Sequence, residues 1–212
     1  MATGVSAHRR DEYLQAARLA IEPGRIELQL DLTTGIALAD RVIGEIDRDR
    51  DGTVSDAEAR AYAAVVERDT ELALDGRALP RQLVEDRAPL VAAMRSGEGT
   101  LRLRWTAALP PLAPGTHVVR FTNAHHADIG VYLANVLVPA SDRVAVTRQD
   151  RDVDQREFAV TYELQPRRGR TAGVLAAGVG GLLAGLVVRH GRRRRFPGRQ
   201  LTRHAARKDA RQ

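Results

Sequence analysis

Apolar and polar residues alternate along several short segments of the chain, and the clearest lies near its start. Between residues 26 and 32 every second position is isoleucine or leucine and the others are polar, which predicts a half-buried strand. The segment 13–21 leads into it through the turn Glu22-Pro23-Gly24-Arg25. Similar segments are residues 100–108, 117–121, 131–138, 143–147 and 158–164. Short strands separated by turns predict an antiparallel β-sandwich over residues 11–165.

Two stretches between these strands have other patterns. Residues 71–74 and 79–84 flank Asp75-Gly76, which predicts a hairpin with a tight turn. Residues 88–99 show no period and are expected to be irregular.

The period changes from two to that of a helix after the second predicted strand. Ala39, Val42, Ile43 and Ile46 share one helical face, and a matching stripe follows a short loop. The residues of that second stripe are Ala59, Tyr62, Ala63 and Val66. We therefore expect an α+β protein in which a helix–loop–helix at residues 36–68 is inserted into the sandwich.

The loop between the two helices is rich in oxygen ligands at regular spacing. Its candidate ligands are Asp47, Asp49, Asp51, Thr53, Ser55 and Glu58. The three aspartates and Glu58 offer carboxylates, Thr53 its backbone carbonyl, and Ser55 a direct or water-mediated contact. Gly52 is the sixth residue of this twelve-residue loop, where a loop that wraps around a cation must turn sharply with positive φ. Without a cation, four carboxylates this close together would repel one another.

This loop and its flanking helices resemble the EF-hand family. The resemblance implies that the site binds Ca²⁺, with Glu58 closing it through both carboxylate oxygens. A second acidic run, residues 150–157, invites the same interpretation but has no glycine at the turn position, and Thr161 stands at its twelfth position. We expect that run to be a charged connection between strands, which leaves a single EF-hand.

Charge is unevenly distributed along the chain. The whole chain has 33 basic and 27 acidic side chains and a net charge of +6. Residues 189–212 contain ten basic residues and one acidic residue, so the rest of the chain is mildly acidic. This asymmetry does not indicate a nucleic-acid-binding domain. The explanation for the basic excess is to be sought in the segment next to the tail.

An uncharged run, residues 171–188, directly precedes the basic tail. As a helix it is about 27 Å long, enough to cross a thin hydrocarbon core. Residues 166–170 are expected to be a linker, and Arg192–Arg195 place the tail in the cytoplasm by the positive-inside rule. The expected partners are membrane lipids and, through Gly181 and Gly185, a second membrane helix or a second copy.

The first ten residues are expected to be a disordered terminus or the remnant of a signal peptide. Val5-Ser6-Ala7 resembles the end of a secretory signal, with cleavage before His8, although the apolar region that should precede it is missing. A single-pass membrane protein with its N-terminal domain outside the cytoplasm fits this interpretation. The alternative is an ordinary disordered terminus.

Other chemistry-bearing residues give weaker signals. His125, His126 and Asp128 lie close together in sequence and are expected to be solvated; alternatively, a histidine there could bind copper or nickel with His8. The chain has no cysteine, and it lacks a G-x-S-x-G, an H-E-x-x-H and a Gly-rich phosphate loop. We therefore expect no enzymatic activity.

A wider resemblance covers most of the body. Residues 8–16, the strand after them, the EF-hand and residues 75–79 look like bacterial exported domains of uncharacterised function, similar to those that precede nickel/cobalt or HupE/UreJ-type transporters. In such relatives the first of these stretches follows a signal peptide. Having one predicted span, this chain is not expected to transport. We expect a structural Ca²⁺ site, and the alternative is an accessory subunit of a metal-uptake or other transport system.

Overall fold

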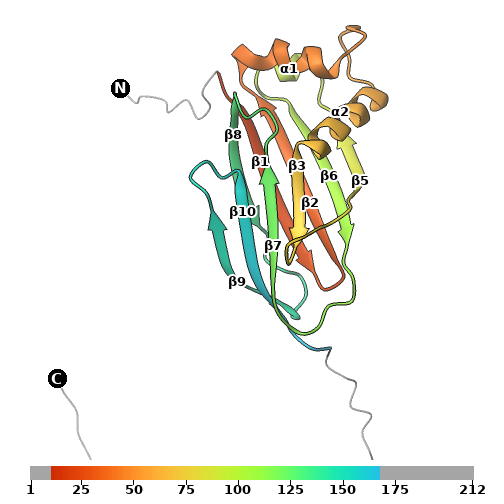
Figure 1. Cartoon of the computed structure of the whole chain (residues 1–212). Coiled ribbons are helices and arrows are strands. Elements are labelled where there is room, and N and C mark those ends of the chain that lie inside the picture. The colour runs from red at the N-terminus through yellow and green to blue at the C-terminus, as the bar shows by residue number, and fades with distance from the viewer. Residues whose placement is uncertain (1–10, 168–212) are drawn as a thin grey trace, which may run out of the picture. The chain divides into compact units, whose positions relative to one another are not determined.

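The computed structural model describes residues 11–167, which form two five-stranded sheets around a shared apolar core (Figure 1). The first sheet has the strand order β5-β6-β2-β1-β8 and the second β4-β3-β7-β10-β9. The strands are β1 (Tyr13–Glu22), β2 (Arg25–Thr34), β3 (Thr70–Leu74), β4 (Arg77–Ala78), β5 (Gln82–Arg87), β6 (Thr100–Ala108), β7 (Gly115–Asn123), β8 (Gly130–Val136), β9 (Val144–Arg151) and β10 (Glu157–Leu164). The prediction of a two-sheet, mostly β body is confirmed.

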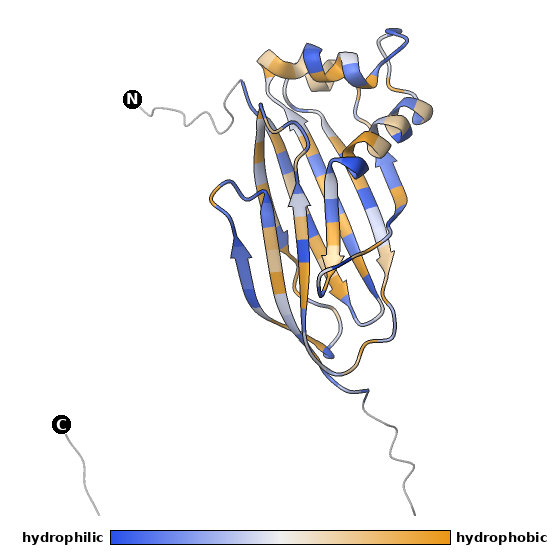
Figure 2. Cartoon of the chain, in the orientation of Figure 1, coloured by the Kyte–Doolittle hydropathy of each residue, from blue (hydrophilic) through white to orange (hydrophobic). Residues whose placement is uncertain are grey.

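The alternating sequence pattern places one face of each central strand in the core. In β2, Ile26, Leu28, Leu30 and Leu32 are buried while the residues between them are half-buried. Figure 2 shows the same alternation of hydrophobic and hydrophilic positions along most strands. The core between the sheets also holds large aromatic side chains, namely Trp105, Phe121, Phe158 and Tyr162.

Two helices lie at the end of the sandwich where β1 begins and β2 ends (Figure 1). After the 3-10 helix η1 (Ile36–Leu38), helix α1 (Ala39–Ile46) and helix α2 (Asp56–Arg68) occupy the stretch between β2 and β3. Each buries the stripe predicted from the sequence: Ala39, Val42, Ile43 and Ile46 in α1, and Ala59, Tyr62, Ala63 and Val66 in α2. Nearly all of these side chains belong to the common core, so the helices are fixed to the sandwich by apolar packing.

The hairpin predicted over residues 71–84 is only partly formed. Strands β3 and β4 pair across Asp75-Gly76, but β4 has only two residues and β5 joins β6 in the other sheet. Pro80 explains the break, because it has no N–H to continue a strand ladder.

Two further expectations need correction. Residues 88–99 contain a short helix, α3 (Val91–Arg95), which buries Val91 and Met94. The sheets are also not purely antiparallel, since β8 runs parallel to β1. Strand β7 belongs to the second sheet, so the chain changes sheets before β8, which therefore enters beside β1 from the same end.

Several predictions concern residues that lie outside the described range. These are the N-terminal residues 1–10 with His8, the last part of the linker, the span at 171–188 with Gly181 and Gly185, and the basic tail at 189–212. Within residues 11–167, no helix is long and apolar enough to cross a membrane.

Candidate metal site

The loop at residues 47–58 is held at both ends by the helices that flank it. Ile46, the last residue of α1, is buried in the core, and the backbone N–H of Asp47 donates to the carbonyl of Ile43. At the other end Ser55 caps α2: its hydroxyl accepts from the N–H of Glu58, while the Glu58 carboxylate accepts from the N–H of Ser55. This capping box orients Glu58 toward the loop.

Each of the three aspartates accepts a hydrogen bond from the loop backbone. Asp47 accepts from the N–H of Gly52 at 3.1 Å, and Asp49 accepts from the N–H of Asp51 at 3.1 Å. Asp51 accepts from the N–H of Thr53 at 2.8 Å. These side-chain-to-backbone hydrogen bonds fold the loop into consecutive turns. They leave the second carboxylate oxygen of each aspartate available to bind a cation.

Two loop residues have left-handed backbone conformations. Gly52 has φ of 84° and Arg50 has φ of 60°. Glycine adopts this conformation without penalty, whereas a side chain such as that of Arg50 makes it unfavourable. The predicted role of Gly52 as the turning residue is therefore confirmed by its geometry.

Glu58 reaches back across the loop and contacts its first part. One carboxylate oxygen accepts from the N–H of Arg48 at 2.7 Å, and the other accepts from the Ser55 hydroxyl at 2.8 Å. The N–H and the hydroxyl of Ser55, helped by the N–H groups of Arg48 and Asp49, lower the pKa of Glu58 to about 2. This carboxylate is therefore ionised at neutral pH.

Asp47, Asp49 and Glu58 together form an acidic cluster. One carboxylate oxygen from each lies within 4.8 Å of the others. Among residues 11–167, this is the group of acidic or histidine side chains close enough together to hold a metal ion. The N–H of Asp51 holds the pKa of Asp49 down, but desolvation and the negative charges of Asp51 and Glu58 outweigh it and raise that pKa above its usual value. A cation would remove this repulsion.

Asp47 has a buried carboxylate oxygen, Oδ1, without a hydrogen-bond partner among the described residues. Buried carboxylate oxygens are normally hydrogen-bonded or paired with a cation. The oxygens gathered here fit a hard cation such as Ca²⁺ and lack the nitrogen or sulfur ligands that favour Zn²⁺ or Cu²⁺.

Of the other three predicted ligands, Asp51 is not part of this acidic cluster, while Thr53 and Ser55 lie on the same loop and the Ser55 hydroxyl contacts Glu58. Asp51 is exposed and also accepts from the Thr53 hydroxyl at 2.7 Å, while the Ser55 hydroxyl is engaged in the capping box. Six predicted ligands thus share one loop, and three of them contribute to the close acidic group.

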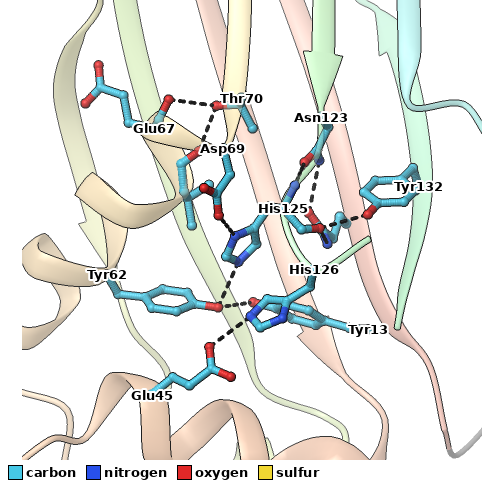
Figure 3. A network of polar contacts seen from close by, with 12 residues as sticks. Tyr13, Glu45, Tyr62, Glu67, Asp69, Thr70, Asn123, His125, His126 and Tyr132 are labelled. Carbon is cyan, nitrogen blue, oxygen red and sulfur yellow. Dashed lines mark hydrogen bonds and ion pairs between the residues drawn. The ribbon is translucent and has the colours of Figure 1, made fainter. Parts of the chain in front are cut away.

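Behind the helices lies a buried polar network that the sequence did not predict (Figure 3). The Tyr13 hydroxyl lies 3.1 Å from that of Tyr62, which lies 3.0 Å from Nε2 of His125. Nδ1 of His125 lies 2.7 Å from a carboxylate oxygen of Asp69, the capping residue that follows α2. Because a carboxylate oxygen accepts, Nδ1 carries the proton and Nε2 accepts from Tyr62.

The network joins both helices to strands of the two sheets. Glu45 of α1 has Oε2 2.9 Å from Nε2 of His126, close enough for an ion pair although the angle is poor for a hydrogen bond. Gln15 of β1 donates to the carbonyl of His125 and accepts from Asn123 of β7. The backbone of the loop at residues 124–129, here called the histidine loop, is therefore held by hydrogen bonds as its side chains are.

The expectation that His125, His126 and Asp128 are solvated is wrong for His125. Its side chain is buried with both ring nitrogens engaged, and burial lowers its pKa. Because both ring nitrogens of His125 already have partners, these contacts argue against the alternative that His125 binds copper or nickel. Asp128 instead pairs with Arg41 at 2.8 Å, which lowers the pKa of Asp128.

The acidic run at residues 150–157 comprises the end of β9, the turn at residues 152–156 and the first residue of β10, so it connects two strands as predicted. The N–H of Glu157 donates to the Asp152 carboxylate, and Gln155 turns the chain with positive φ. In the described part of the chain this run contributes no group of three metal-ligating side chains.

The chain was compared with protein-family models, with curated proteins and with solved structures, and none of these matches it.

Proposed function

We propose that the loop at residues 47–58 is an EF-hand that binds one Ca²⁺ ion through Asp47, Asp49, Asp51, Thr53, Ser55 and Glu58. The observation that carries this proposal is the buried, unpartnered carboxylate oxygen of Asp47 beside Asp49 and Glu58. Ca²⁺ takes six to eight oxygen ligands with flexible geometry, whereas Mg²⁺ demands a near-ideal octahedron and keeps several waters. A loop offering oxygens of several kinds suits Ca²⁺ better.

The ion is proposed to act as a structural clamp. In sensor EF-hands, Ca²⁺ changes the angle between the two helices. Here α1 and α2 contribute most of their buried stripes to the sandwich core, and Tyr62 and Glu45 contact the histidine loop. Opening the pair would expose these side chains, so ordering of the loop against the sandwich is the better supported effect.

The setting proposed for this domain is the outer face of a bacterial membrane. The uncharged run at 171–188 and the arginine cluster after it support a single-pass anchor with the basic tail in the cytoplasm. Extracellular Ca²⁺-binding modules have dissociation constants of about 0.1–1 mM. A site of that affinity would stay largely occupied where calcium is abundant, which agrees with a structural role.

Calcium titration by isothermal calorimetry tests the proposal. Wild type is expected to bind one ion per chain with a dissociation constant of about 0.1–1 mM. Glu58→Gln should weaken binding at least about tenfold, because it removes a charged ligand. The matched control is Asp154→Asn in the β9–β10 turn, an exposed acidic residue outside the loop, which should bind as wild type does. Equal binding by wild type and Glu58→Gln would refute the assignment.

A further inference from the structure

The end of the sandwich opposite the helices, here called the exit pole, consists of turns, loops and the point where the chain leaves the fold. It comprises residues 22–25, 75–76, 109–114, 137–143 and 165–167. Strands β1 and β8 run parallel away from the helix end, so β8 finishes here, with the N–H of Leu137 donating to the carbonyl of Leu19. Figure 1 shows the helices at one end and the chain exit at the other.

The exit pole presents apolar side chains to solvent. Val138 is 93% exposed and Leu137 is 47% exposed, side by side in the loop between β8 and β9. At the same pole the β6–β7 connection has the exposed residues Pro110, Pro111 and Pro114. Two adjacent exposed apolar side chains are unfavourable in water and suit a surface that meets another apolar phase.

The apolar loop is fastened to the segment that leads out of the fold. The N–H of Gln165 donates to the carbonyl of Arg143 at 2.7 Å, and Nε of Arg143 donates to the carbonyl of Gln165 at 3.1 Å. Arg143 ends the loop that carries Leu137 and Val138. The outgoing chain and the apolar loop therefore share one location.

The length of chain between the exit and the uncharged run limits how far the two can separate. Arg167 is the last described residue, and the uncharged run begins at Thr171. Four residue steps, even fully extended, span at most about 14 Å. The polar headgroup layer on one side of a bilayer is about 5–8 Å thick. If residues 171–188 cross the membrane, the exit pole lies at or near the lipid surface.

We propose that Leu137 and Val138 insert into the boundary between headgroups and acyl chains of the membrane that holds the anchor. The sandwich then stands on the bilayer by its exit pole, and the calcium loop faces away from the lipid. This inference rests on the proposed membrane anchor but is independent of calcium binding.

The test uses the full chain, whose lack of cysteine permits single labelling sites. Val138→Cys and the control Val153→Cys are each labelled with an environment-sensitive fluorophore and reconstituted into vesicles of zwitterionic and anionic phospholipids. Val153 is fully exposed in the β9–β10 turn, at the opposite end from the exit pole. The label at position 138 should shift its emission to the blue and be quenched severalfold more by spin-labelled lipids than the label at position 153.

Three other outcomes would contradict the proposal, and each identifies which part of it is wrong. If the chain cofractionates with vesicles but both labels are quenched equally, the anchor stands and the docking of the exit pole is wrong. A blue shift at position 138 without lipid quenching means that the loop contacts another copy of the chain. If the chain does not cofractionate with vesicles, the anchor fails and the docking fails with it.

Discussion

Removing the Tyr62 hydroxyl tests whether the buried network holds the helices on the sandwich. Tyr62→Phe keeps the ring but deletes two contacts, one to the Tyr13 hydroxyl and one to Nε2 of His125. Both remaining groups are buried, and no other hydrogen-bond partner of either atom is found among the described residues. Each buried group left without a partner costs about 1–3 kcal/mol, so unfolding should become easier by about 2–6 kcal/mol.

The assay is urea unfolding followed by circular dichroism, with Tyr162→Phe as the matched control. The Tyr162 hydroxyl is also buried but has no hydrogen-bond partner within residues 11–167, so its removal should be neutral or slightly stabilising. The double variant Tyr13→Phe/Tyr62→Phe should lose less than the sum of the single losses, because Tyr13 is no longer left unpartnered. Equal stability of Tyr62→Phe and Tyr162→Phe would refute the reasoning.

Three further predictions concern the loop and the histidines. Calcium at about 10 mM should raise the unfolding free energy of wild type by about 1.4–2.7 kcal/mol for dissociation constants of about 0.1–1 mM, and in calorimetry the gain for Glu58→Gln should be smaller by at least about 1 kcal/mol. Gly52→Ala should cost about 1–2 kcal/mol in urea unfolding because of its φ of 84°, whereas Gly44→Ala in α1 should stabilise by about 0.5–1 kcal/mol. Acidification from about pH 7.5 to about pH 5.5 should destabilise His117→Asn more than wild type.

His117 and His125 have pKa shifts of opposite direction. A hydrogen bond to the Asp75 carboxylate raises the pKa of His117, so its stabilising contribution is complete at low pH and is lost as pH rises through the folded pKa. Burial lowers the pKa of His125 below the usual 6.5, so its contribution is lost as pH falls below about 6.5. His117→Asn leaves only the second effect. Parallel pH dependences in urea unfolding of variant and wild type would contradict this account.

Local pattern predicted most of the elements but not how they assemble. The alternation in β2 and the stripes of α1 and α2 predict burial correctly, because each depends on the period of its own element. Nothing local indicates that β5 pairs with β6 rather than continuing the hairpin, or that β8 lies parallel to β1. Such choices are made by the packing of the whole core.

In the candidate site, too, local spacing predicted the loop ligands but not the contacts between distant residues. Ligand spacing placed all six residues on one loop, and the structure brings Asp47, Asp49 and Glu58 together there. The network around His125 could not be predicted, because its partners lie far apart in sequence; Tyr62 is 63 positions from His125. A tyrosine within an apolar helical stripe was the one signal available, and it indicated only burial.

The amide of Gly52 reports most directly on the central claim that the loop binds calcium. Its N–H donates to the Asp47 carboxylate at 3.1 Å, so a cation held by that carboxylate would change the electric field at this proton. In nuclear magnetic resonance spectra of the ¹⁵N-labelled protein, we predict that the Gly52 amide resonance shifts progressively with added Ca²⁺ and saturates at one ion per chain, while that of Gly76 stays in place. A Gly52 resonance that does not respond to calcium at about 10 mM would contradict the account.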